Sequence, residues 1–468
     1  MPQPTDSRAV RTGPSLIARL CLGVVFLAYL LTTVALFFWG PWQYPVSDGR
    51  GRFILFLGAV HVAFAVGYLW GIRGGPRSVR IRVGAGTLVL VASVAELLLL
   101  LPTSVVNTGS WIPRPGAALQ NLAAAYTGSL TLRETSGPYV NYVRMLLAPV
   151  LALAAPLGVF YWTQLSGVAR ATFALSVLGS ISLFVAMGAN AGAAHWMALF
   201  PWFVLAGHLS GVQKLTARGW VCAIAVQALS VLLFVGLFTA SMNQRTGSFA
   251  KYGRLPGVGA ELVTRPAPVP ADAQHAPSLS RPAAPVGAGG LAGDGPQAPS
   301  PSRSAARVGA DGLAGYLTQG YYAVYLSLQE PFVPGYGVGN SVFLQRQAAR
   351  LLGQPDILKR PYPERIQARG WNAYGYWASI YPWIASDVTF PGVVLVMLLI
   401  GWLTGRVWVD VLGGGNPFAV ALLGQLLILL YYIPAHNKVM HAGEGVLAFW
   451  TLLLLWGVSR TRQGRPER

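Results

Sequence analysis

Two arginines four residues apart in the C-terminal third of the chain, Arg346 and Arg350, could bind a phosphate-containing ligand. Asn340 or Ser341 can N-cap a short helix at this place, and Gly353 can end it. Residues i and i+4 share one face of a helix, and two guanidinium groups on one face suit the diphosphate under a lipid headgroup. The opposite face carries an apolar stripe made of Leu344, Ala348, Leu351 and Leu352. The alternative is an interfacial helix whose arginines contact anionic lipid or solvent.

A second arginine pair, Arg365 and Arg369, precedes a run of aromatic residues. The run contains Trp371, Tyr374, Tyr376 and Trp377. A pyranose has an apolar face and a rim of hydroxyls, so aromatic rings beside hydrogen-bonding groups predict a glycan-binding cleft. The alternative is the aromatic belt that anchors membrane proteins at the interface.

The amino-acid composition indicates that these arginines and aromatic residues belong to a membrane protein. Of the 468 residues, 54% are hydrophobic and only 10% are charged, and the mean hydropathy is +0.50, which excludes an ordinary soluble enzyme. Both cysteines, Cys21 and Cys222, lie in apolar runs, so neither a disulfide framework nor a zinc motif is expected. The first apolar stretch is longer than the apolar region of a signal peptide and is expected to be a retained span.

Ten segments are candidate membrane-spanning helices by length and apolar composition, of which the sixth is short and the weakest. They cover residues 17–39, 53–72, 84–102, 145–162, 171–189, 193–208, 219–240, 388–407, 416–434 and 444–459. With the N-terminus inside, the inner segments carry 15 of the Lys and Arg residues, and the short outer loops carry 6. The positive-inside rule therefore predicts an inner-membrane protein with both termini in the cytoplasm, and the net charge of +19 needs no nucleic acid as a partner.

The predicted fold class is an all-α polytopic membrane protein with three regions. Residues 1–240 form an N-terminal membrane domain of about seven spans, and residues 388–468 form a C-terminal membrane domain of three spans. Between them lies an extracytoplasmic loop, 241–387. Its first part, 264–311, is rich in Pro, Ala and Gly and is predicted to be disordered. Its second part, 312–387, is rich in aromatic and charged residues and is predicted to fold as a cap on the outer membrane face; we call it the outer cap.

Four stretches of the sequence resemble one family of membrane enzymes. They are GANAG (188–192), GYLTQGYYAVYLSLQEPFVPGYGVGNS (315–341), YWASIYPWIASDVTFPGVVLVMLLIGWLTGRVW (376–408) and YYIPAHN (431–437). Together with the many spans and one long late outer loop, they are similar to the O-antigen polymerase, or oligosaccharide repeat-unit polymerase, family (Wzy-type). The resemblance is strongest over residues 312–440 and covers the N-terminal half mainly through the pattern of spans.

The resemblance implies a reaction at the outer membrane face. An undecaprenyl-diphosphate-linked glycan would be transferred to another lipid-linked repeat unit, with release of undecaprenyl diphosphate. It also implies a fold like that of the metal-independent integral-membrane glycosyltransferases (GT-C-like), with no metal and no cofactor. Fixed cations must then stabilise the leaving diphosphate, and Arg346, Arg350, Arg365 and Arg369 are the candidates. Besides the lipid-linked oligosaccharide and the bilayer, a flippase and a chain-length regulator are candidate partners.

A general base for the acceptor hydroxyl would be a carboxylate or a histidine near the outer surface, and two residues are alternative candidates. Asp387 lies where the outer cap meets the eighth span, where it could instead N-cap that span. His436 lies between the last two spans, where it could instead be a solvated loop residue.

Three other ionisable residues lie within predicted spans. Glu96, near the outer end of the third span, could line the same cavity or pair with an arginine, whereas His61 and His195 are typical of helix packing. The spacing of GWLTG (401–405) also favours helix packing. Two other functions stay open: an O-antigen ligase-type transferase, and a non-enzymatic transporter or flippase of lipid-linked oligosaccharides. A transporter would be expected to contain internal repeats, and none is visible in the sequence.

Overall fold

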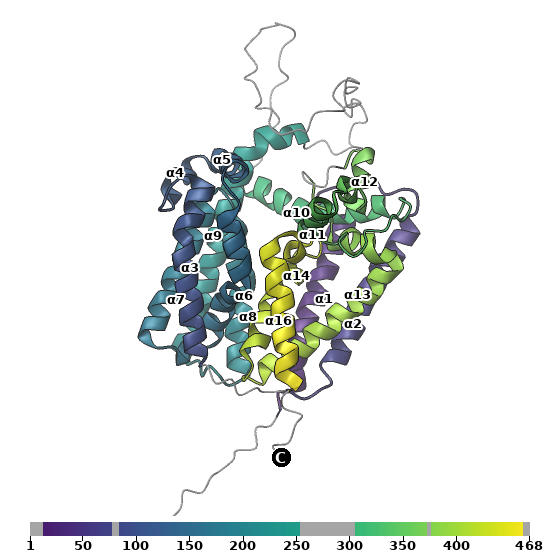
Figure 1. Ribbon diagram of the computed structural model, residues 1–468. Helices are drawn as coiled ribbons and strands as arrows, with labels where there is room; N and C mark the ends of the chain where they lie inside the picture. The colour runs from purple at the N-terminus through teal and green to yellow at the C-terminus, as the bar shows by residue number, and fades with distance from the viewer. Residues whose placement is uncertain (1–12, 77–83, 253–304, 372–375, 462–468) are drawn as a thin grey trace, which may run out of the picture.

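The computed structural model describes residues 13–76, 84–252, 305–371 and 376–461, and all regular elements in these ranges are helices. Long helices run side by side as a bundle, and shorter helices cover one end of it (Figure 1). The helices of the bundle are α1 (Leu16–Trp39), α2 (Arg50–Gly71), α3 (Ala85–Thr108), α6 (Tyr139–Phe160), α7 (Gly167–Ala186), α8 (Ala191–Leu209), α9 (Ala217–Tyr252), α13 (Ile380–Leu412), α14 (Pro417–Tyr432) and α16 (Gly443–Thr461). Helix α10 (Ala305–Ser327) is also long but lies among the shorter helices (Figure 1).

The apolar helices confirm a polytopic α-helical membrane protein. Within the described residues, seven helices are long and apolar enough to cross a membrane: α1, α2, α3, α6, α7, α9 and α13. The other three predicted spans are also helical, but α14 is shorter, and α8 and α16 are less apolar. The count of ten spans therefore remains a prediction.

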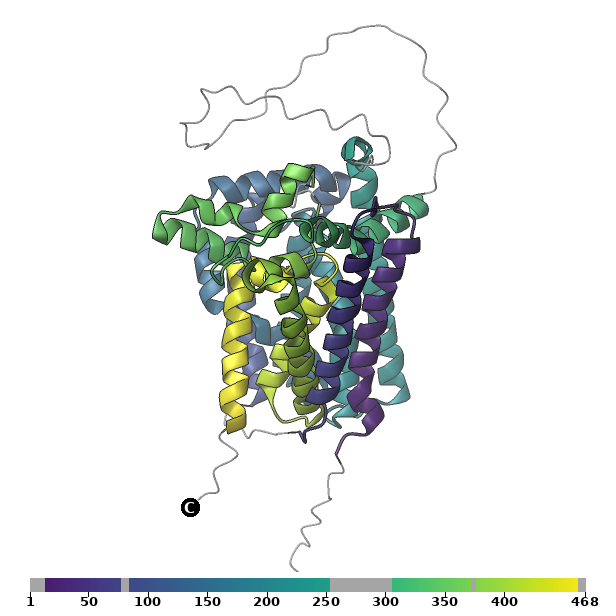
Figure 2. The same cartoon turned by 90° about the vertical axis from the view of Figure 1, so that its right-hand side faces the viewer.

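The start of α1 and the end of α16 lie at the same end of the bundle (Figure 2). Trp408 near the end of α13 donates a 2.8 Å hydrogen bond to the carbonyl of Ala18 in α1. The fully buried carboxylate of Asp410 in α13 accepts from Trp456 of α16 at 3.0 Å. It also pairs with two arginines, Arg406 of α13 and Arg460 of α16, each at 3.2 Å. We call these four side chains the Asp410 cluster: Arg406, Asp410, Trp456 and Arg460.

Helices α2 and α13 pack so closely that their backbones are in contact at four glycines. A Cβ atom on Gly401 would lie 2.2 Å from the carbonyl oxygen of Phe64, and one on Gly67 would lie 2.0 Å from that of Leu398. One turn further along, Gly71 and Gly405 make the same kind of contact. Small residues four apart allow such close packing in membranes. The prediction that GWLTG packs helices is therefore confirmed, and GYLWG (67–71) is its partner.

Replacing Gly401 by Val is expected to destabilise the protein by about 1–3 kcal/mol or more, because the two helices must separate to admit the side chain. The measurement is thermal unfolding of the purified protein in detergent. Gly58→Val is the control, since Gly58 lies in α2, the helix that packs against α13, and has no atom within 4 Å of its added Cβ. Equal unfolding temperatures for the two variants would contradict the backbone contact.

Short helices gather at the end of the bundle opposite to the Asp410 cluster (Figure 1). They are α4 (Pro115–Gln120), α5 (Leu122–Thr135), α11 (Val342–Leu352), η3 (Pro355–Lys359), α12 (Tyr362–Arg365), η4 (Ile366–Arg369) and α15 (Lys438–His441). Helix α10 joins this layer to the bundle, since Tyr321 in α10 shares a 2.8 Å hydrogen bond with Thr33 of α1. The short helix η1 (Trp162–Gln164) follows the end of α6.

Two boundaries differ from the sequence prediction. Helix α10 begins at Ala305, so residues 305–311 are helical rather than part of a disordered tract, consistent with the helix-forming alanines at its start. The rest of that tract, from 264 to 304, lies outside the described residues. Helix α13 begins at Ile380, inside the outer cap, and its backbone breaks at Thr389, where φ is 65°. The apolar span therefore starts at this kink, one residue after the predicted start.

Candidate functional site

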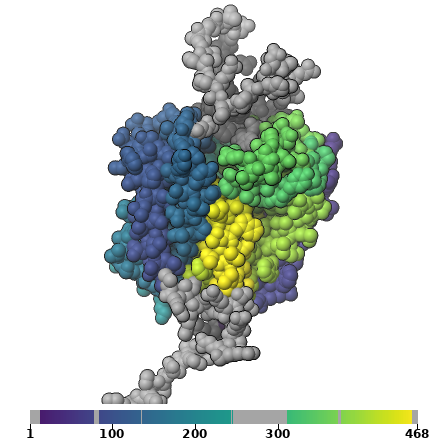
Figure 3. Space-filling view, viewed as in Figure 1, coloured from purple at the N-terminus to yellow at the C-terminus, as the bar shows by residue number. Residues whose placement is uncertain are grey.

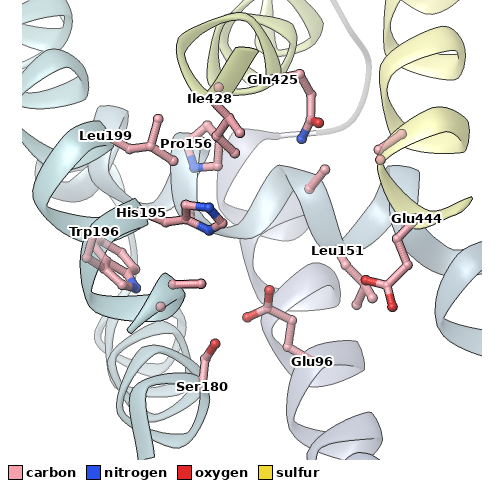
Figure 4. Close-up of a pocket in the computed structure, with 18 of the residues that line it drawn as sticks. Glu96, Leu151, Pro156, Ser180, His195, Trp196, Leu199, Gln425, Ile428 and Glu444 are labelled. Atoms are coloured by element: carbon pink, nitrogen blue, oxygen red, sulfur yellow. The ribbon is translucent and has the colours of Figure 1, made fainter. Parts of the chain in front are cut away.

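A cavity of about 380 Å³ lies inside the bundle between α3, α6, α7, α8, α14, α15 and α16. Most of its wall is apolar and comes from α6, α7 and α8, with Leu151, Phe173 and Phe200 among the lining residues. Its polar lining residues include Glu96, His195, Gln425 and Glu444, which are labelled in Figure 4. Arg144 and Lys438 also line it. An apolar chamber with charged groups is suited to an amphipathic ligand that has an anionic or cationic head.

An ion pair between α6 and α16 lies in the wall of the cavity. Arg144 Nε lies 2.9 Å from Glu444 Oε1, and the terminal NH2 group of Arg144 lies 3.2 Å from Glu444 Oε2. The other terminal nitrogen of Arg144 donates to Thr103 of α3 at 3.4 Å. The guanidinium is thus presented as a planar fork, held by α3 and aimed at a carboxylate.

Two further cations lie near this pair. Lys438 lines the cavity, and in the described part of the chain its Nζ has no hydrogen-bond or ion-pair partner. Burial, followed by repulsion from Arg133, lowers the pKa of Lys438, whereas Glu444 raises it. Arg133 reaches in from α5 and donates to the side chain of Asn107 in α3. Arg144 and Lys438 line the cavity, and Arg133 lies outside its wall but interacts electrostatically with Arg144 and Glu444; we call these three residues the cation cluster.

Glu96 and His195 lie across the cavity from each other in the close-up (Figure 4). Helix α3 continues to Thr108, so Glu96 lies near its middle rather than near its outer end. Glu96 has Ser176 as a hydrogen-bond partner and is within electrostatic reach of Arg144. The prediction that Glu96 lines a cavity is confirmed. The buried Nε2 atoms of His195 and His61 both have no hydrogen-bond partner within the described residues, but only His195 lines the cavity. His61, by contrast, is buried and hydrogen-bonds to the carbonyl of Leu57 through Nδ1, as a packing histidine would.

His436 lies beside the cavity wall in a group of aromatic rings. Its ring centroid is 4.9 Å from that of Trp377, 5.2 Å from that of Tyr432 and 5.3 Å from that of His441. Burial, followed by repulsion from His441, holds the pKa of His436 well below its ordinary value. The imidazole is therefore neutral at neutral pH, which is the form that can accept a proton. His436 is packed rather than solvated, which corrects the alternative interpretation of a solvated loop histidine.

Asp387 is surrounded by a glycine-rich loop of the outer cap. Its carboxylate accepts 2.8 Å hydrogen bonds from the backbone N–H groups of Gly339 and Asn340 and from the Asn340 side chain. A Cβ on Gly335 would lie 2.5 Å from Asp387 Oδ1, so the close approach requires glycine there. The donors to Asp387 all come from this loop rather than from the helix that follows the kink at Thr389, so Asp387 does not serve as the N-cap of the span. Three donors occupy its oxygens, so little acceptor capacity is left for a substrate hydroxyl.

Replacing Asp387 by Asn is expected to destabilise the protein by about 1–3 kcal/mol, because an amide cannot accept all three hydrogen bonds and its NH2 group would face backbone donors. Protein abundance and thermal unfolding in detergent measure the effect. Asp356→Asn is the control, since Asp356 forms an exposed ion pair with Lys359. Normal abundance combined with complete loss of activity would instead support Asp387 as the base.

The helix predicted around Arg346 and Arg350 is confirmed as α11. The Ser341 side chain caps it by accepting from the N–H of Leu344, and Gly353 ends it with φ of 62°. Arg346 and Arg350 are exposed, and Arg346 is close enough to His441 to lower the pKa of that histidine, after burial and Lys438. At the end of the helix, Leu351 is 83% exposed.

The second arginine pair, Arg365 and Arg369, lies elsewhere in the outer cap and contacts the residues that follow α10 in the chain. Arg369 pairs with Glu330 at 2.5 Å and with the side chain of Gln329 at 2.8 Å. Arg365 lies 3.7 Å from Glu330 and donates to the carbonyl of Pro331 at 2.5 Å. These protein partners connect η4 and α12 to the end of α10. Neither arginine is among the residues that line the cavity.

The aromatic residues expected to bind glycan separate into two groups. Trp371 is 1% exposed and packs between Tyr322 and Tyr376, so it belongs to the core of the outer cap. Trp377 is partly exposed and contacts Tyr316 as well as His436. Tyr374 lies outside the described residues.

The sequence interpretation missed the cation cluster, although each member carries a weak signal. Arg144 stands in the first turns of an otherwise apolar helix, where a charge is costly unless it is used. Lys438 and Glu444 are six residues apart and flank a turn between two apolar helices. Arg133 lies in the outer loop 103–144, for which the sequence suggested no role.

Comparison of the chain with known protein families, with curated proteins and with solved structures finds no match. The fold and the cavity therefore carry the functional argument.

Proposed function

We propose that the protein is a membrane glycosyltransferase that polymerises undecaprenyl-diphosphate-linked oligosaccharide repeat units on the outer face of the cytoplasmic membrane. The observation that carries the proposal is the cavity, which combines an apolar wall within a membrane bundle with two lining cations, Arg144 and Lys438. A polyprenyl diphosphate has the same two parts, an apolar chain and a diphosphate. Fixed cations also stabilise such a leaving group when no metal takes part.

In the proposed reaction, an acceptor hydroxyl oxygen attacks the anomeric carbon of the donor glycan. The bond between that carbon and the diphosphate oxygen breaks, the hydroxyl proton passes to a base, and the lipid diphosphate leaves. Arg144 and Lys438 would carry the departing negative charge. Of the two proposed bases we favour His436, because its ring contacts Tyr432, which in turn contacts the cavity-lining His195, whereas the oxygens of Asp387 are occupied by the loop.

The proposed orientation has the short helices outside and both termini in the cytoplasm. Reporter fusions near residues 215 and 410 should then give cytoplasmic signals, and a fusion near residue 110 an extracytoplasmic one. The distribution of Lys and Arg in the short loops supports this orientation. A GT-C-like arrangement and partnership with a flippase and a chain-length regulator are part of the same proposal.

A second candidate function is transport of lipid-linked oligosaccharides. The specific observation that favours it is the pair of ionisable side chains, Glu96 and His195, that face each other inside the bundle (Figure 4). Intramembrane ionisable residues often belong to proton relays or substrate pathways. A ligase-type transferase would use the same cavity chemistry as a polymerase and differ in its acceptor.

One reconstitution experiment separates these functions. The purified protein is placed in liposomes with a lipid-linked repeat unit, and the glycan products are separated on a gel. A ladder of longer lipid-linked glycans supports the polymerase. Transfer to a different lipid acceptor supports the ligase, and movement of unchanged repeat units between leaflets supports the transporter.

A further inference from the structure

The carboxylate of Glu444 occupies the position on Arg144 that an anionic ligand would need. It contacts Nε and one terminal nitrogen of the guanidinium at 2.9 and 3.2 Å, which is the bidentate edge that also binds phosphate. Both residues line the cavity. In the structure, an internal anion therefore neutralises Arg144, one member of the cation cluster.

The surroundings allow this carboxylate to leave while the arginine stays in place. The Glu444 side chain is 40% exposed and that of Arg144 is 25% exposed, so the ion pair is partly solvated and costs little to break. Thr103 continues to accept from Arg144 after Glu444 has moved. Glu444 lies in the first turn of α16, where a negative charge is stabilised by the helix N-terminus whether or not it is paired.

The backbone around Glu444 has little freedom, so the movement is confined to its side chain. A Cβ on Gly445 would lie 2.1 Å from the carbonyl oxygen of Val439, and one on Gly443 would lie 2.5 Å from Met145 Sδ. These contacts hold the start of α16 against α15 and α6. Helix α16 is visible at the surface between the N-terminal half of the bundle and the outer cap (Figure 3).

We infer that Glu444 is a built-in competitor at the anion site, and that a diphosphate binds by displacing its carboxylate from Arg144. The inference rests on the proposed function for the identity of the ligand as a lipid diphosphate. The competition itself requires only that the site bind a phosphate anion. Glu444 thereby limits retention of the released diphosphate, because its carboxylate returns to the arginine when the product leaves.

The test measures binding of inorganic pyrophosphate to the purified full-length protein in detergent by isothermal titration calorimetry. Glu444→Gln removes the competing charge, and we expect about fivefold tighter binding, roughly 1 kcal/mol at room temperature. Arg144→Gln should weaken binding at least about tenfold. Asp356→Asn removes one acidic charge from an exposed ion pair in the outer cap, and its affinity should equal that of the wild type.

Unchanged or weaker binding in Glu444→Gln would overturn the inference, and so would absence of pyrophosphate binding in both the wild type and this variant. Glu444→Ala is the second variant, and it should also bind pyrophosphate more tightly than the wild type. The melting temperature of each variant without ligand, compared with that of the wild type, identifies a misfolded protein. The glycan-ladder assay is independent of this result. Tighter pyrophosphate binding in Glu444→Gln without any polymer from the wild type would refute the polymerase and leave the competition intact.

Discussion

Arg144→Lys is expected to lower polymer formation by about 100-fold or more, while protein abundance stays close to that of the wild type. Lysine keeps the positive charge but offers a single ammonium where a planar fork, held by Thr103, is needed for two phosphate oxygens. Abundance should hold, because the ion pair with Glu444 is partly solvated and adds little to stability. The measurement is a glycan ladder beside an immunoblot from the same cells.

Arg170→Lys is the matched control for this experiment. Arg170 is partly exposed at the start of α7, donates to the carbonyls of Trp162 and Thr163, and lies over the Trp162 ring. It is not among the residues that line the cavity. Full-length polymer at normal abundance from Arg144→Lys would exclude Arg144 from the reaction and return attention to Arg346 and Arg350.

Asp410→Asn is expected to destabilise the folded protein by about 3–5 kcal/mol. The Asp410 carboxylate is completely buried and is the counter-ion of Arg406 and Arg460, so its neutralisation leaves two guanidinium groups without their acidic partner. The expected result is a strong decrease in abundance and in the unfolding temperature in detergent. An unchanged unfolding temperature relative to Asp356→Asn would mean that water or lipid headgroups solvate the cluster.

The sequence was sufficient to predict features that depend on nearby residues. The ten apolar segments predicted from the sequence are all helical, because the length and composition of a segment determine whether it can form a membrane-spanning helix. Helix α11 followed from its capping residues Ser341 and Gly353. The glycine pair at 401 and 405 indicated close packing, since only small residues allow it.

The site depends on tertiary contacts, which the sequence could not reveal. Thr103, Arg133, Arg144 and Glu444 come from four different helices, and their proximity results from the packing of α3, α5, α6 and α16. Asp387 illustrates the same limit, because its loop partners lie 47 and 48 residues earlier in the chain. Local sequence could show only an acid at a span boundary, for which a helix cap and a base were equally reasonable roles.

The glycine contact between α2 and α13 has a consequence for how the protein is made. Helix α2 ends at Gly71, and its partner begins at Ile380, so the ribosome completes the first helix long before it synthesises the second. Until α13 reaches the membrane, lipid must cover the groove at Gly67 and Gly71, and the α1–α2 hairpin remains without its main neighbour. The contact between α2 and α13 therefore forms only after both helices have been inserted into the membrane. A chain truncated before Gly401 should leave α1 and α2 exposed to membrane proteases and quality control.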